Sequence, residues 1–264
     1  MSTVKDVAAA IEEFAPLSLQ EDYDNAGLVV GRPTDEVTGV LLAVDVTDEV
    51  MDEAAANGCN MIVTHHPIVF HAMKRFNSAS YVERLVERAI REGVALYACH
   101  TNLDSAPEGM SFRLARMLGV ESPRVLEPSP KMEGAGFGAV GELPQAVATA
   151  EFLQRIARVT GAACIRHSRI ASPTVLRVAV CTGAGASMTG AARAAGADVY
   201  VTSDLKYNDF MTPDGALTVA DTGHFESEYC AIRILFDVLS KKMFTFAVRE
   251  SGCSRNPVYY CTTK

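Results

Sequence analysis

The sequence predicts an α/β protein built from two similar lobes, and three observations support this fold class. Apolar runs typical of buried strands alternate with amphipathic helical segments along the chain. Most of these runs are continuously apolar, as in parallel strands that helices cover on both faces. The chain has 264 residues, which is enough for one large domain or two closely packed ones.

The expected elements follow one another in order. We expect strands at residues 39–47, 60–64, 94–99, 136–142, 176–181, 198–202, 216–220 and 244–249, and helices at residues 4–15, 48–57, 81–90, 107–118, 144–159, 187–195 and 225–239. The run Gly39–Thr47 is apolar along most of its length, which is typical of a strand inside a sheet. Val4, Val7 and Ile11 recur with the spacing of one helical face.

A proline-, glycine- and serine-rich stretch at residues 123–136 is the best candidate for a hinge. It divides the chain into a first lobe, residues 1–128, and a second lobe, residues 129–264. Residues 41–64 and 177–202 share a degenerate pattern of strand, loop, helix, glycine and a strand ending in Val-Thr, which indicates that the lobes are similar. Chance similarity is the alternative, because any two βα units share this order of elements.

Composition and charge exclude several classes of protein. The chain has 24 Lys and Arg against 32 Asp and Glu, a balance that argues against a general nucleic-acid binder. Its longest strongly apolar runs, at residues 40–44 and 94–99, are far shorter than the ~18 residues of a membrane span. The seven cysteines are scattered without a Cys-x-x-Cys pair, which argues against a disulfide framework or a thiolate zinc site. We expect a cytoplasmic protein without a membrane segment.

The strongest local motif is the pair His65-His66, directly after an expected strand. Ligands of open α/β sheets gather at the carboxyl ends of strands. Neighbouring side chains on an extended backbone point apart, so the pair suits two metal ions better than one. The alternative is one surface histidine and one buried histidine with a structural hydrogen bond.

A second motif, His100-Thr101-Asn102-Leu103-Asp104, follows another expected strand. Asp104 would ordinarily cap the next helix, but Ser105 and Glu108 offer that helix a capping box of their own. The carboxylate of Asp104 is then available for a metal. His100 fits three roles, as a ligand, as a group that orients a ligand, or as a buried histidine at a strand end.

The third motif places His224 and Glu228 four residues apart, on one face at a helix start. The alternative is an ordinary helix start, where the helix dipole favours acidic residues near the N-terminus. Taken together, the three motifs supply three histidines and two carboxylates at three βα edges, which is the donor set of a two-metal site. Nitrogen and carboxylate ligands without thiolate suit Zn²⁺, Mn²⁺, Fe or Ni²⁺ better than Ca²⁺.

The set and order of these motifs resemble the NIF-three-like dinuclear metal-centre family, whose members are widely named GTP cyclohydrolase I type 2 homologues. The resemblance covers essentially the whole chain. It is carried by DNAGL at residues 24–28, VTHHP at 63–67, HTNLD at 100–104, VAVCTGAGAS at 178–187, ADVYVTSD at 197–204 and GHFESE at 223–228. The sequence departs from the family pattern at Thr222 and at Ser203-Asp204, which are not ligand positions.

The resemblance implies a site, a fold and an assembly. The family's ligands of two divalent cations map onto His65, His66, Asp104, His224 and Glu228, with Glu228 as the bridge. His100 falls close to the metals, and we predict that it is the catalytic general acid or base. The implied fold has two α/β lobes packed around a central metal site, and the implied assembly is a toroidal homohexamer.

Two functions from different classes follow. The first is a hydrolase in which a metal-activated water attacks a small-molecule substrate, either a purine-type ring such as that of GTP, a cyclic amide or a phosphoester. The second is a non-catalytic, metal-binding oligomeric protein that serves as an interaction or metal-handling module. Turnover that scales with metal occupancy would distinguish the first from the second.

The internal repeat adds a prediction for Asp204. If the strand ends at Thr64 and Thr202 are equivalent, Asp204 takes the place of His66. Its carboxylate would then accept a hydrogen bond from the imidazole of a ligand histidine and fix the tautomer of that ring. The alternative is that Asp204 caps the turn into residues 205–209.

Overall fold

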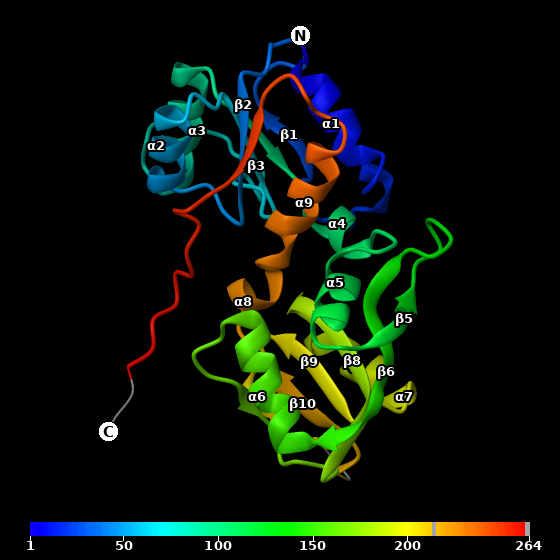
Figure 1. Ribbon diagram of the computed structural model, residues 1–264. Helices are drawn as coiled ribbons and strands as arrows, with labels where there is room; N and C mark the ends of the chain where they lie inside the picture. The colour runs from blue at the N-terminus through cyan, green and yellow to red at the C-terminus, as the bar shows by residue number, and fades with distance from the viewer. Residues whose placement is uncertain (213–214, 262–264) are drawn as a thin grey trace. The chain divides into compact units, whose positions relative to one another are not determined.

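The computed structural model describes residues 1–212 and 215–261 and is drawn in Figure 1. The chain divides into two compact units. The first unit comprises Met1–Ala106 and Ala231–Arg255, and the second comprises Pro107–Cys230 and the described residues after Arg255. Each unit contains one β-sheet with helices packed on it, so the predicted α/β fold class is confirmed.

The sheet of the first unit has five strands in the order β1-β4-β3-β2-β11. They are β1 (Gly27–Val30), β2 (Gly39–Ala43), β3 (Met61–Thr64), β4 (Ala95–Ala98) and β11 (Ala247–Glu250). β2, β3, β4 and β11 run parallel, whereas β1 pairs antiparallel with β4. The carboxyl ends of the parallel strands therefore meet at one edge of the sheet, where ligands of such folds bind.

Helices cover both faces of this sheet. They are α1 (Val4–Glu12), α2 (Asp48–Ala56), α3 (Tyr81–Glu92) and α9 (Cys230–Ser240). Figure 1 shows α2 and α3 on one side of the strands and α1 and α9 on the other. Alternate side chains of the strands, Leu41, Ile62 and Leu96, form one core cluster with Val50 of α2 and Leu85 of α3. This buried face holds the strand ends of the first unit in place.

The sheet of the second unit has six strands in the order β5-β6-β8-β9-β10-β7. They are β5 (Glu121–Pro128), β6 (Gly136–Ala148), β7 (Arg166–His167), β8 (Thr174–Ala184), β9 (Val199–Ser203) and β10 (Thr218–Asp221). β8, β9 and β10 run parallel, and the remaining strands pair antiparallel. The carboxyl ends of β8, β9 and β10 thus form a second edge at which polar residues gather.

Both faces of this second sheet are also covered by helices. Val178, Val180 and Val201 pack with α5 (Met110–Met117) and α6 (Thr149–Thr160). The alternating residues of the same strands, among them Ala179 and Tyr200, pack on the other face with Ala192 of α7 (Thr189–Ala194). The period of two residues between the faces is that of a pleated strand buried on both sides.

The division of the chain differs from the division expected at residues 128 and 129. The chain passes between the units after Ala106, Cys230 and Arg255, so α9 and β11 return to the first unit. The stretch expected to be a hinge instead forms β5 and the start of β6, which pair as an antiparallel hairpin. Proline is tolerated there because β5 is an edge strand of its sheet.

The two segments of the internal repeat fold alike. Residues 41–64 contain β2, α2 and β3, and residues 177–202 contain parts of β8 and β9 with α7 between them. In both segments the two strands are parallel neighbours. The repeat therefore describes one βαβ unit in each sheet, as the pattern predicted.

Among the predicted helices, two differ most from their expected bounds. The helix expected at residues 144–159 begins only at Thr149, because β6 continues to Ala148 and resumes pairing with β8 after an irregularity. The helix expected at residues 225–239 is divided into α8 (His224–Glu228) and α9. This division ends α8 at Glu228, one of the predicted ligands.

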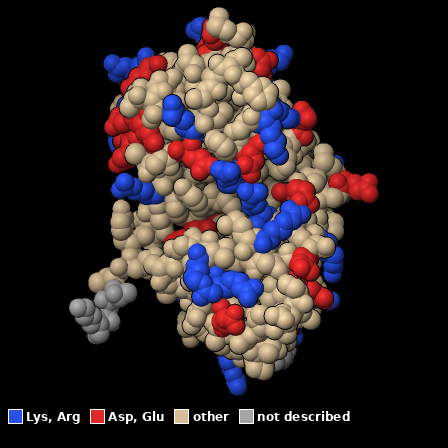
Figure 2. Space-filling view, in the orientation of Figure 1, with Lys and Arg blue, Asp and Glu red and all other residues tan. Residues whose placement is uncertain are grey.

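Two surface properties bear on possible partners. Within residues 1–212 and 215–261, no helix combines the length and the apolar character that crossing a bilayer requires. On the face drawn in Figure 2, Lys and Arg side chains are interspersed with Asp and Glu side chains. The whole sequence carries a formal net charge of -8.

Candidate functional site

Three histidines meet at the carboxyl edge of the first unit's sheet. His65 and His66 follow β3, and His100 follows the neighbouring strand β4. The ring centroids lie 4.9 Å apart for His65 and His66, 5.2 Å for His65 and His100, and 5.5 Å for His66 and His100. One ring nitrogen of each lies within 4.8 Å of the others, so this histidine cluster (His65, His66 and His100) could hold a metal ion.

The rings of His65 and His66 do not point apart as expected from an extended backbone. β3 ends at Thr64, and both histidines lie in a bend after it. The Thr64 hydroxyl donates to the His66 carbonyl at 2.7 Å, which stabilises this bend. The alternation argument for two metals therefore does not hold here, because it requires a continuing strand.

The Nδ1 atom of each clustered histidine has an acceptor that fixes its tautomer. His65 Nδ1 lies 2.8 Å from the Cys99 carbonyl, and His66 Nδ1 lies 2.8 Å from Asp45 Oδ1. His100 Nδ1 lies 2.7 Å from Asp24 Oδ1. Carbonyl and ionised carboxylate oxygens only accept, so Nδ1 must carry the proton. Each neutral ring then has its lone pair on Nε2, which is the arrangement typical of metal-ligating histidines.

Asp24 is the most constrained of these acceptors. Its side chain is fully buried, and it also accepts from the Thr101 backbone N–H at 3.0 Å and from the Thr101 hydroxyl. Burial alone would raise the pKa of Asp24, but the hydrogen bonds from His100 and Thr101 outweigh it and hold this pKa at about 2. Asp24 is therefore a charged group that orients His100.

Asp104 lies in α4 (Thr101–Ser105), a short helix that the sequence did not predict. Its Oδ2 is 3.9 Å from His65 Nε2, which brings this carboxylate to the histidine cluster. The expected capping box is wrong, because the next helix begins at Met110 with Gly109 as its N-cap. The Ser105 hydroxyl is instead buried and has no hydrogen-bond partner among the described residues. Asp104 is thus near the cluster although the capping argument for it fails.

The second unit presents a smaller group at α8. His224 Nε2 lies 2.9 Å from Glu228 Oε2, and His224 Nδ1 lies 2.8 Å from Asp204 Oδ2. Burial alone would lower the pKa of His224, but Glu228 and Asp204 outweigh it and raise this pKa to about 9. The ring is therefore protonated at neutral pH in the absence of a metal. A divalent cation bound here would replace the Nε2 proton.

The contact between Asp204 and His224 is the one that the internal repeat predicted. The alternative role, capping the following turn, is performed by other carboxylates. The backbone N–H of Leu205 donates to Asp221, and that of Lys206 donates to Asp209. Asp204 therefore hydrogen-bonds the His224 imidazole, and Asp221 and Asp209 cap the turn.

A glycine at the carboxyl end of β8 creates the space for Glu228. Gly183 has φ +67°, and a Cβ built on it would lie 2.2 Å from Glu228 Oε1. The Gly183 N–H donates to the Ser227 hydroxyl at 2.9 Å, and its carbonyl accepts from the Ser203 hydroxyl at 2.6 Å. These buried hydroxyls hold the Gly183 backbone against the carboxylate. The stretch Gly183-Ala184-Gly185 thus supports α8. It does not complete the G-x-G-x-x-G motif of dinucleotide-binding proteins, because Met188 stands at the third glycine position.

We expect Gly183→Ala to displace the Glu228 carboxylate. A non-glycine residue in the left-handed region costs roughly 1–2 kcal/mol, and the new methyl group would push Oε1 away. Metal affinity should fall at least ~10-fold, as when an orienting partner is lost. A chelator-competition titration measures it. Gly190→Ala is the matched control, since open space surrounds that helical glycine, and equal affinities of the two variants would contradict the expectation.

We expect Asp204→Asn to weaken metal binding while the protein folds normally. Asparagine tolerates the left-handed backbone at this position, where φ is +56°, but its neutral amide accepts more weakly from the imidazole N–H. Metal affinity should fall ~10-fold, the low end of the range for a group that orients a ligand. We expect the low end because the Asp204 side chain is 52% exposed. Thermal melting of the metal-free variant is the control. Unchanged metal affinity with unchanged melting would exclude a role for Asp204 in metal binding.

The sequence-predicted residues thus fall into two groups. His65, His66, His100 and Asp104 meet in the first unit, and His224 and Glu228 meet in the second. Sequence reasoning missed Asp24 and Asp45 as partners of histidines. Asp45 follows β2, so the rule that found the other residues at strand ends applies to it as well.

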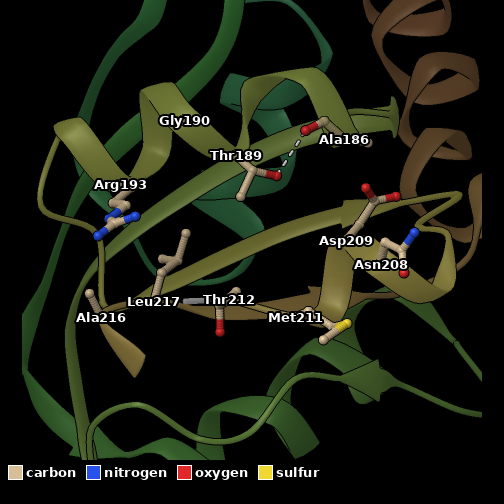
Figure 3. A pocket seen from close by; sticks show the side chains of 10 residues that line it. All are labelled: Ala186, Thr189, Gly190, Arg193, Asn208, Asp209, Met211, Thr212, Ala216 and Leu217. Carbon is tan, nitrogen blue, oxygen red and sulfur yellow. Dashed lines mark hydrogen bonds between the residues drawn. The ribbon is translucent and has the colours of Figure 1, made fainter. Parts of the chain in front are cut away.

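A separate cavity of about 250 Å³ in the second unit contains none of these residues (Figure 3). Thr189 and Arg193 of α7 line one side of it, and Asn208, Asp209 and Met211 line the other. The Asp209 carboxylate already accepts from the Lys206 N–H at 2.7 Å, and the Thr189 hydroxyl donates to the Ala186 carbonyl at 2.9 Å. The cavity is therefore not part of the candidate site.

Comparisons with known proteins agree with these observations. The family model Duf34/NIF3 (NGG1p interacting factor 3) matches residues 2–257. A Clostridium perfringens protein named GTP cyclohydrolase 1 type 2 homolog is 32% identical over 228 residues, covering 86% of this chain and 87% of its own length. A Streptomyces coelicolor protein of the same name is 34% identical over 235 residues, covering 87% of this chain and 82% of its own length.

Solved structures share the fold. The Staphylococcus aureus hypothetical protein SA1388 matches with a TM-score of 0.89 at 23% identity, over 98% of this chain and 99% of its own. A Bacillus cereus protein related to NIF3 matches with a TM-score of 0.89 at 21% identity, over the same shares of the two chains. With a family model that spans nearly the whole sequence and relatives above 30% identity, the chain belongs to the Duf34/NIF3 family.

Proposed function

We propose that the protein is a metal-dependent hydrolase of a small molecule, with two divalent cations per chain. The proposed ligands are His65, His66, Asp104, His224 and Glu228. The observation that supports this most directly is the fixed tautomer of the clustered histidines, whose Nδ1 atoms all have oxygen acceptors. Rings prepared in this way offer Nε2 to a cation.

The chemistry of the donors fits such a group. Imidazole and carboxylate donors without thiolate suit Zn²⁺, Mn²⁺, Fe or Ni²⁺. When bound, these cations polarise a carbonyl or phosphoryl oxygen and lower the pKa of water toward ~7. Gly183 leaves space for the Glu228 carboxylate, and Asp204 holds His224 in one orientation. The residues of each unit therefore suit metal binding.

His100 is the proposed general acid or base. Its Nδ1 proton is held by the buried Asp24 carboxylate, so Nε2 can accept a proton from water or return one to a leaving group. The relatives named GTP cyclohydrolase 1 type 2 homolog support a purine-type ring as substrate, and a cyclic amide or phosphoester fits the same chemistry. A base oriented by a carboxylate is common to all three reactions.

Metal reconstitution followed by a substrate screen tests this proposal. Elemental analysis should give two divalent cations per chain, and turnover of nucleotides, pterins or cyclic amides should scale with occupancy. His100→Gln should keep the metal and lose turnover. One ion or none under every reconstitution would refute the dinuclear site.

The second candidate function is a non-catalytic, metal-binding oligomeric protein. The family description, NGG1p interacting factor 3, supports it because it names a protein interaction. We propose a toroidal homohexamer for either function, on the strength of the family resemblance. Light scattering at micromolar concentration tests the assembly, and a monomer would refute it. Full metal occupancy without turnover of any substrate in the screen would favour the non-catalytic function.

A further inference from the structure

Exposed aromatic rings lie beside the histidine cluster of the first unit. Tyr23 is 65% exposed and Phe70 is 39% exposed, and their ring centroids are 6.4 Å apart. The Phe70 centroid is 5.0 Å from that of His71 and 6.0 Å from that of His100. Tyr23, Phe70 and His71 thus form an aromatic wall that reaches the predicted general base.

Hydrogen bonds fix the two loops that carry this wall. The Asn25 side-chain amide donates to the Val69 carbonyl at 2.6 Å, which joins the loop of Tyr23 to the loop of Phe70. Asp24, next to Tyr23, accepts from the Thr101 N–H at 3.0 Å. The backbone beside each ring is therefore held in place before any ligand arrives, which reduces the entropy lost on binding.

We propose that the aromatic wall binds a planar heteroaromatic ring of the substrate by stacking, and that Phe70 provides the main contact. The inference rests on the proposed function, since it places that ring beside His100. Stacking on an aromatic side chain is tolerant of ring identity, because every such ring has a π-face. Three side chains are too small a surface for a stable protein partner, which requires ~800 Å² on each side.

Tyr23 adds a polar contact to this wall. The buried part of the Tyr23 side chain, together with the nearby charges of Glu21, Asp24 and Asp104, raises the pKa of Tyr23. Its phenol therefore stays protonated at neutral pH and can donate a hydrogen bond. Carbonyl oxygens and ring nitrogens, the acceptors of a heteroaromatic ring, are suitable partners for it. The phenol hydroxyl thus gives the wall one polar group beside its aromatic faces.

Binding of four planar probes to the metal-loaded protein tests the inference. The probes are guanosine, adenosine, uridine and pterin, with ribose as the probe that lacks an aromatic ring, and calorimetry gives the dissociation constants. Phe70→Leu should weaken the binding of planar probes roughly 10-fold, which corresponds to one lost stacking contact. The affinity for ribose should not change. Phe70→Tyr should restore binding, because it restores the ring.

Phe244→Leu is the matched control. Phe244 is 82% exposed and precedes β11 at the amino end of the parallel strands, opposite the histidine cluster. The same titrations after metal removal separate this inference from the proposed function. Ring binding should persist with the same dependence on Phe70, because the loops are held by protein hydrogen bonds. If the protein fails to bind metal, ring binding that depends on Phe70 would thus still confirm the aromatic wall.

Three results would overturn the inference. The first is wild-type protein that binds none of the four planar probes. The second is equal affinity of wild type and Phe70→Leu for the probes that do bind. The third is a change of molecular mass in Phe70→Leu, measured by light scattering, with unchanged probe affinity. That outcome would identify the wall as a contact between copies of the chain.

Discussion

Glu228→Gln is expected to remove most of the bound metal. The Glu228 side chain is 4% exposed and lies 2.9 Å from His224 Nε2, so its charge acts where water screens it little. Glutamine keeps the shape and loses the charge, and its amide cannot bridge two cations. Loss of a group that only orients a ligand costs ~10–100-fold in metal affinity, so loss of Glu228, a proposed ligand, should exceed that range.

Glu226→Gln is the matched control for this variant. Glu226 lies in the same helix, and its carboxylate accepts from the Asn256 side-chain amide at 2.8 Å. Asp221 is a poorer control, because it accepts from Arg166 and from the Leu205 N–H and so supports the fold. Elemental analysis after reconstitution gives the metal content of each variant. Equal losses in Glu226→Gln and Glu228→Gln would exclude the bridging role.

Strands that are apolar along their length could be predicted from the sequence. A strand that is buried on both faces has a continuous run of apolar residues, which the sequence shows directly. β2, β3, β4 and β9 all lie within expected ranges or differ by a residue at their ends. β5 could not be predicted in this way. It lies at a sheet edge, carries Pro123 and Pro128, and is mostly exposed, so its residues have the composition of a loop.

The division into units was harder to predict than the fold class. Composition marks where a chain lacks apolar residues, but a return of the chain to an earlier sheet leaves no such mark. β11 pairs with β2, more than two hundred residues earlier in the sequence, through contacts that only the folded chain makes. The expected division after residue 128 followed the only local signal available, the prolines and glycines that form a hairpin.

The histidines of the candidate site could be predicted because parallel strands bring their carboxyl ends together. That rule located His65, His66 and His100, and it extends to Asp45 after β2. It could not locate Asp24, which lies in a loop before β1 and is 76 residues from His100 along the chain. The stretch Asp24-Asn25-Ala26-Gly27 has the composition of a turn, so its residue types alone did not point to a contact with His100.

Asp24→Asn is expected to reduce turnover without removing the metal. The ionised carboxylate accepts the Nδ1 proton of His100 at 2.7 Å and so keeps the lone pair on Nε2. An asparagine amide has one acceptor oxygen and adds two donors, so it cannot satisfy both His100 and Thr101. The His100 ring should change tautomer or turn. A general base contributes ~100–10,000-fold, and turnover should fall toward the lower end of that range.

Nitrogen NMR of labelled His100 separates positioning from a purely structural role, because it reports the tautomer directly. Asp22→Asn is the control. It removes the same charge from an exposed side chain that lies two residues before Asp24 in the sequence. We expect His100 to lose the Nδ1–H tautomer in Asp24→Asn and to keep it in Asp22→Asn, with metal content unchanged in both. If His100 kept that tautomer in Asp24→Asn and turnover matched the control, Asp24 would serve only to hold its loop against Thr101.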